Sequence, residues 1–262
     1  GLQNAITSTL AIGGNCLQIF AGSPRMWARS LYPPKTTAEF KLLATRHELA
    51  PTYIHALYLT NLASDNPSLV EKSKKALITD MTNGAEIDSS GIVLHIGSHQ
   101  GRGWPAMKNL VIQSIKEVLD ETPAKSLLLL ENSAGQQGKI GSFPELSDIL
   151  SAIDSPRLRI CLDTAHAFEG GYNFQTTEGL EMWISDITRY VGIAKLELLH
   201  LNDSKTPLGS GRDMHENIGD GYIGSHSIGR LINHDKLKHL PLILEVPGID
   251  DFGPDAENIA RV

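Results

Sequence analysis

Residues 158–172 read LRICLDTAHAFEGGY, and this stretch decides the fold that the sequence predicts. It begins as a short apolar run typical of a strand and ends at Asp163 and His166, just before a Gly-Gly turn that cannot prolong a strand. One such ending means little, because a neighbouring backbone group usually satisfies a buried polar residue. The same kind of ending, however, recurs along the chain.

Strand-like runs alternate with helical patterns throughout the 262 residues. The predicted strands are residues 16–20, 52–56, 91–97, 126–132, 158–163, 195–203 and 240–246, and the predicted helices are residues 1–12, 36–49, 67–86, 105–120, 144–153, 177–191 and 227–235. Several strands are apolar on both faces, which is typical of a parallel sheet covered by helices.

The pattern predicts a single α/β domain over residues 1–262, a (β/α)₈ TIM barrel that lacks its first strand. A closed barrel needs eight strands, and the chain begins with a helix. We therefore expect the first strand to precede Gly1, and a slight truncation at the C-terminal end.

The composition limits the classes of partner. The net charge of −7 argues against a broad basic face for nucleic acid, although several bound dications would bring it close to neutrality. Cys16 and Cys161 lie in predicted strands and are interpreted as small apolar residues in a reducing compartment. No apolar run is long enough for a membrane span, so we expect a cytoplasmic protein.

Six successive predicted strands end in side chains that can bind a metal. They are His55, His95, Glu131, Asp163 with His166, His200 and Glu245, and the loop after His200 adds Asp213 and His215. In a parallel barrel these ends meet at one rim, where nine such groups would repel and desolvate one another without cations. Imidazole and carboxylate without cysteine suit Zn²⁺, with Mn²⁺ or Fe²⁺ as alternatives. Three ions fit the count, and such clusters serve phosphate ester hydrolysis.

The residues also resemble the endonuclease IV family of apurinic/apyrimidinic (AP) endonucleases, (β/α)₈ enzymes that carry three zinc ions. The similar motifs are HALY at 55–58, LHIGS at 94–98, LENSAG at 130–135, CLDTAHAF at 161–168, HLNDSK at 200–205, DMH at 213–215, GDGYIG at 219–224 and LILE at 242–245. They follow one another along nearly the whole chain.

The resemblance implies a division of the ligands among three ions. His55, His95 and Glu131 would hold the first; Glu131, Asp163, His200 and Glu245 the second; His166, Asp213 and His215 the third. It implies base excision repair, in which the phosphodiester 5′ to an abasic site is hydrolysed to 3′-hydroxyl and 5′-deoxyribose phosphate ends. It further implies a catalytic role for Glu131 and 3′-end phosphodiesterase or phosphatase activity.

The resemblance also implies double-stranded DNA containing abasic sites as the partner and a monomeric enzyme. By position, Arg25, Tyr58 and Leu59 match the side chains with which the family fills the gap left by the flipped nucleotide. Two other interpretations stay open, since Tyr58 and Leu59 could cap the barrel and Arg25 could pair with a surface acid. Asn202, Asp203 and Lys205 follow His200 and could orient ligands or contact phosphate, of which orientation is favoured.

The chain departs from the family pattern at three places. The first strand, with its Gly-x-His-x-Ser pattern, is absent; Gly22-Ser23 stands where members often have Lys-Asn; and Met214 stands where the Asp-Arg-His motif has arginine. The last two changes remove cationic groups, so we expect weaker DNA engagement. They leave the ligands untouched.

Two alternatives to the nuclease remain. A sugar isomerase or epimerase on the same barrel would need one divalent ion, for which Glu131, Asp163, His200 and Glu245 would suffice. A non-catalytic binder of damaged DNA belongs to a third class. Metal content and incision of abasic DNA discriminate among them.

Overall fold

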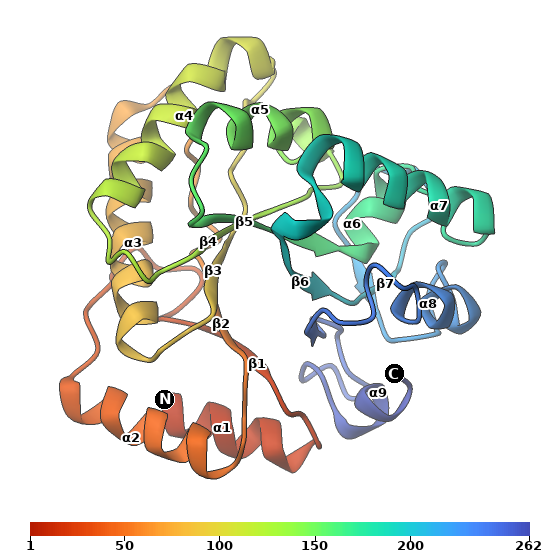
Figure 1. Cartoon of the computed structure of the whole chain (residues 1–262), viewed down its shortest axis with the longest axis horizontal. Helices are drawn as coiled ribbons and strands as arrows, with labels where there is room; N and C mark the ends of the chain where they lie inside the picture. Colours follow the sequence, from red (N-terminus) through yellow and green to blue (C-terminus); the bar gives the residue numbers. More distant parts are fainter. The chain divides into compact units, whose positions relative to one another are not determined.

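The computed structural model describes all 262 residues, which form two compact units (Figure 1). The first unit comprises residues 1–131, 137–140 and 148–159, and the second comprises residues 132–136, 141–147 and 160–262. Helix α5 (Phe143–Ile153) and strand β5 (Leu158–Asp163) pass from one unit to the other. No helix combines the length and the hydropathy that crossing a membrane requires.

The first unit is built on four parallel strands with helices outside them. The strands are β1 (Leu17–Phe20), β2 (Thr52–His55), β3 (Gly91–Leu94) and β4 (Leu128–Glu131), paired in that order, and the helices are α1 (Leu2–Ala11), α2 (Pro34–Arg46), α3 (Pro67–Glu86) and α4 (Trp104–Asp120). Figure 1 shows α3 and α4 side by side. All four residues of β2, β3 and β4 are buried, as predicted for strands that are covered on both faces.

The second unit continues the same pattern. Its strands are the last residues of β5, the strands β6 (Leu196–His200) and β9 (Leu242–Ile243), and the short pair β7 (Asp203–Ser204) and β8 (His215–Glu216). Its helices are α6 (Thr164–Glu169), α7 (Thr177–Asp186), α8 (Ser225–Ile232) and α9 (Ala256–Ala260). The short helices are η1 (Gln136–Gly138, shared with the first unit), η2 (Ile187–Val191) and η3 (Ile193–Lys195). β5, β6 and β9 are parallel neighbours, and β7 and β8 are antiparallel. The register places Asp163 beside His200.

The seven predicted strands are all present, but most are shorter than predicted. β3 ends at Leu94, so His95 lies one residue beyond it, and β9 is reduced to Leu242–Ile243. The helix predicted over residues 177–191 ends as an α-helix at Asp186 and continues as a π-helical turn.

The first residue of a helix was predicted correctly for α3, which has a capping side chain, and wrongly for α2, which has none. α3 begins at Pro67 as predicted, because Asn66 accepts from the Ser68 amide and proline needs no donor at the first position. The predicted start of α2 at residue 36 was wrong. The helix already begins at Pro34, and the Thr37 hydroxyl donates to the Pro34 carbonyl instead.

Candidate metal centre

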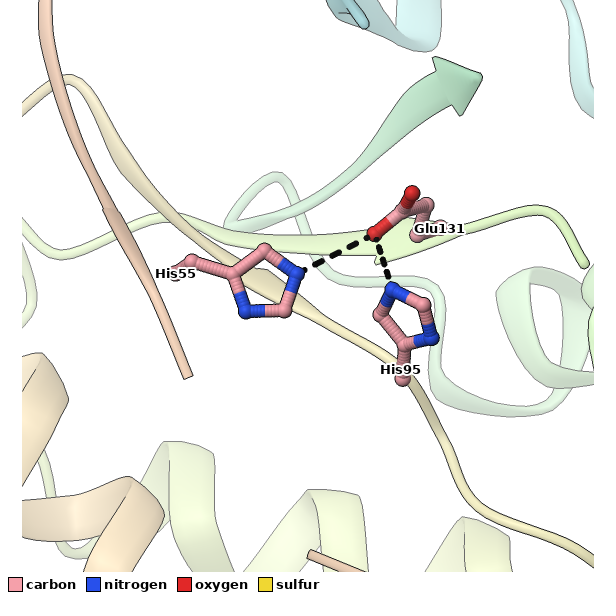
Figure 2. A group of neighbouring side chains, drawn as sticks. All are labelled: His55, His95 and Glu131. Carbon is pink, nitrogen blue, oxygen red and sulfur yellow. Dashed lines mark ion pairs between the residues drawn. The ribbon is translucent and has the colours of Figure 1, made fainter. Parts of the chain in front are cut away.

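Three predicted ligands from successive strands meet in the first unit. His55 ends β2, His95 follows β3 and Glu131 ends β4, because parallel strands deliver their carboxyl ends to the same edge. Glu131 Oε2 lies 3.4 Å from His55 Nε2 and 2.9 Å from His95 Nε2. Figure 2 shows both imidazoles turned toward this one carboxylate. His55 and Glu131 are each only 1% exposed.

The tautomer of His55 follows from its second ring nitrogen. His55 Nδ1 lies 2.7 Å from the Ala56 carbonyl oxygen, which can only accept, so Nδ1 carries a proton. In the neutral ring, Nε2 then presents a lone pair to the Glu131 carboxylate. A lone pair and a buried carboxylate repel each other unless a proton or a cation lies between them. The arrangement fits a metal ion.

The remaining six predicted ligands lie in the second unit, and Asp163 is their centre. Asp163 is the N-cap of α6, and its Oδ1 accepts the His166 amide at 2.7 Å. This cap ends β5 and starts the helix that carries His166. One ligand atom each from Asp163, His166 and His215 lies within 4.8 Å of the others, and the same holds for Asp163, His200 and Glu245.

Asp213 and His215 follow β6 in the chain and complete the cluster around His166. Asp213 Oδ1 lies 3.1 Å from His166 Nε2 and 3.8 Å from His215 Nε2, and His215 Nε2 lies 3.5 Å from Asp163 Oδ2. His166 Nδ1 faces the Asn132 carbonyl at 3.0 Å, and His215 Nδ1 faces the Glu245 carbonyl at 3.3 Å. Metal-binding histidines commonly donate their other nitrogen to a carbonyl in this way.

Two asparagines fix the ligands, and one of them was missed from the sequence. Asn202 Nδ2 donates to Asp163 Oδ2 at 2.7 Å, while its Oδ1 accepts the Glu245 amide at 2.8 Å, which supports the orienting interpretation. Asn132 was not singled out. Its side chain accepts the Asp163 amide at 2.6 Å and donates to the Asp163 carbonyl at 3.0 Å. The sequence signals were its place directly after a strand-end glutamate and within the LENSAG motif.

The three predicted DNA-contacting side chains all lie in loops that follow β1 and β2. Tyr58 and Leu59 are 52% and 39% exposed. The Tyr58 ring packs edge-on against Phe20 and His55, with centroids 5.0 Å away in each case. Arg25 is exposed, and no acidic side chain pairs with it. Tyr58 therefore covers the His55 side of the cluster and still offers half of its surface to a ligand.

Comparison with known proteins places the chain in a family. The family model described as xylose isomerase-like TIM barrel matches residues 7–261. A probable endonuclease 4 of Halothermothrix orenii is 38% identical and the match covers 98% of this chain and 93% of that protein; one of Aquifex aeolicus is 37% identical over 95% of this chain and 89% of its own length.

Solved structures agree. Endonuclease IV from Thermus thermophilus superposes with a TM-score of 0.87 at 32% identity, covering 99% of this chain and 92% of that one. A D-tagatose 3-epimerase-like protein reaches a TM-score of 0.72 at 19% identity, over 95% of this chain and 86% of that chain, which shows a common fold only. Both comparisons confirm the predicted TIM-barrel class. This chain belongs to the endonuclease IV family, within the xylose isomerase-like TIM barrels.

Proposed function

We propose that this chain is a metal-dependent AP endonuclease of base excision repair. It hydrolyses the phosphodiester 5′ to an abasic site and leaves 3′-hydroxyl and 5′-deoxyribose phosphate ends. The observation that carries the proposal is the gathering of all nine predicted ligands, at strand ends and in the segment after β6, into imidazole–carboxylate clusters in which five of the nine side chains are buried. The names of the similar proteins support the same activity.

The donor set suits three Zn²⁺ ions, with Mn²⁺ or Fe²⁺ as substitutes. We assign the first ion to His55, His95 and Glu131, the second to Glu131, Asp163, His200 and Glu245, and the third to His166, Asp213 and His215. Glu131 would serve the first and the second ion, as the resemblance to the family implies. When bound, such ions lower the pKa of water and stabilise charge on phosphate and leaving oxygens.

The chain's own residues then have three tasks. The backbone carbonyls opposite Nδ1 hold the imidazoles of His55, His166 and His215 with Nε2 turned toward the ligand groups. Asn202 donates to the Asp163 carboxylate, which prevents that carboxylate from rotating away, and Asn132 holds the backbone of Asp163. Arg25, Tyr58 and Leu59 form the DNA-contacting edge, where they occupy the gap beside the flipped nucleotide.

Metal removal tests the proposal directly. We expect the purified protein to hold about three zinc ions and to cut an oligonucleotide duplex containing one tetrahydrofuran abasic analogue. EDTA should abolish incision, and Zn²⁺ should restore it, because the clusters offer no other source of Lewis acidity. Mass spectrometry of the ends checks the 3′-hydroxyl product. Incision that resists EDTA, or a metal-loaded protein that does not cut, would contradict the proposal.

The sugar isomerase alternative makes a different prediction. It uses four ligands and leaves His55, His95, His166, Asp213 and His215 without a task, yet each of these four histidines lies close to a carboxylate of the clusters and Asp213 lies close to His166. About one Mn²⁺ or Mg²⁺ per chain, with conversion of a keto sugar, would favour the isomerase.

Tyr58 tests the DNA-contacting edge separately from the chemistry. We expect Tyr58→Ala to raise KM for abasic DNA by roughly tenfold, since base stacking on an aromatic ring contributes about 1–3 kcal/mol. Tyr58→Phe keeps the ring and should stay near wild type. Metal content should be unchanged in both. An unchanged KM for the alanine variant would show that the ring only covers His55.

The proposal includes further points that the same protein can test. We propose double-stranded DNA as the partner, a monomeric state, a cytoplasmic location, and 3′-end phosphodiesterase or phosphatase activity. Size-exclusion chromatography with light scattering measures the mass in solution. A duplex with a 3′-phosphate at a nick measures the trimming activity.

A further inference from the structure

We propose that Glu169 is a positioning residue that holds Asp213 and His215 in place to share the third metal ion with His166. The inference rests on the proposed function and deepens it, since it concerns one of the three ions. Glu169 is the last residue of α6, the helix that carries His166, and its side chain does not belong to the predicted ligand set. It is 1% exposed.

The Glu169 carboxylate joins α6 to the loop that carries Asp213 and His215. Its Oε1 accepts hydrogen bonds from Ser204 Oγ at 2.7 Å, Thr206 Oγ1 at 2.9 Å and the Met214 amide at 3.3 Å. Met214 is the residue between the two loop ligands. One oxygen atom therefore contacts β7, the loop just after it and the residue that directly precedes β8.

The main chain strengthens the same connection. The Gly211 amide donates to the Glu169 carbonyl at 3.0 Å, and the Gly209 amide donates to the Phe168 carbonyl at 3.1 Å. β7 and β8 pair Ser204 with His215, and the Lys205 amide donates to the Met214 carbonyl at 2.9 Å. The loop thus approaches the end of α6 at several points, and Glu169 is the only side chain of α6 among these contacts that reaches Met214.

The burial of a carboxylate at this point needs a reason. Burial raises the pKa of Glu169, while the Ser204 and Thr206 hydroxyls lower it, and Oε2 makes no hydrogen bond. A buried acid with one unsatisfied oxygen is costly, and an alanine would leave two hydroxyls and an amide to find other partners. The Glu169 carboxylate offsets this cost because it fixes the distance between His166 and the loop that carries Asp213 and His215.

The test separates positioning from general stability. We expect Glu169→Ala to weaken the affinity for the third zinc by roughly 10 to 100-fold, the effect usual for residues that orient metal ligands, while two ions stay bound. Metal content measured against a graded series of chelator concentrations reports this. Glu169→Gln keeps an oxygen that accepts the same hydrogen bonds and should retain about three ions. Glu178→Ala, an exposed glutamate in the first turn of α7, is the matched control.

Hydrogen exchange in the metal-free protein gives a second measurement that does not depend on the ions. Residues 203–216 should exchange faster in Glu169→Ala than in wild type, with β2 to β4 unchanged. Equal exchange in this segment, or parallel loss of all three ions, would overturn the inference. A wild-type protein that binds metal but does not cut abasic DNA would contradict the proposed function alone.

Discussion

Glu131→Ala is expected to lower the single-turnover rate of incision at a tetrahydrofuran site by at least about 10³-fold, which corresponds to about 4 kcal/mol in the barrier. The reason is that both His55 Nε2 and His95 Nε2 face its carboxylate oxygen Oε2. If Glu131 also serves the second ion, as the motifs imply, its loss weakens two ions together. Metal content should fall with the rate.

Two controls separate this effect from damage to the barrel. Glu131→Gln keeps the volume of a side chain that is 1% exposed, so it should fold normally and still lose metal because the charge is gone. Glu121→Ala removes an exposed glutamate at the end of α4 and should cut like wild type. Near wild-type incision by Glu131→Ala would show that Glu131 is not a catalytic residue.

The sequence predicted those parts of the fold that depend on local patterns. Periodicity located seven strands, and α3 has the predicted bounds because proline and asparagine fix its start. The residues that end β2, β4, β5 and β6 were also predicted as ligands, since a polar residue after a buried apolar run is visible in the sequence itself. The parallel arrangement then brings these ends together without any further information.

The remaining features depend on partners that are distant in the chain. Asn132 is separated from Asp163 by 31 residues, and Glu169 from Met214 by 45, so no spacing rule connects them. α6 was missed because its Asp163 cap belongs both to the strand pattern and to the ligand set. No sequence pattern distinguishes a buried glutamate such as Glu169 from an exposed one, and its burial and three hydrogen-bond donors appear only in the structure.

The second large effect is expected at a buried ion pair below the loop that carries Arg25. Arg29 Nε lies 3.2 Å from Asp80 Oδ1 on α3, and both side chains are almost fully buried. Arg29 Nη1 also donates to the carbonyls of Ser23 and Met26 at 3.0 and 3.1 Å. Arg29→Ala should lower the free energy of unfolding by about 3–5 kcal/mol, because it leaves Asp80 buried without its partner. Urea unfolding of the metal-free protein measures this.

The pKa of Asp80 shows that the charged carboxylate is disfavoured in the folded protein even with Arg29 beside it. Burial raises this pKa to about 6, and Arg29 only partly lowers it. A raised carboxyl pKa means that the folded state binds more protons than the unfolded state between pH 4 and 6, so stability falls as pH rises through this window.

Replacing both partners by apolar residues tests this argument. Arg29→Met with Asp80→Leu should restore most of the lost stability and remove the pH dependence between pH 4 and 6. The double variant still lacks the hydrogen bonds from Arg29 to the carbonyls of the loop that carries Arg25, so its KM for abasic DNA should exceed that of the wild type while its metal content is normal. A double variant with wild-type KM would show that the loop is ordered without the guanidinium. A double variant as unstable as Arg29→Ala would show that the Arg29–Asp80 ion pair itself stabilises the fold.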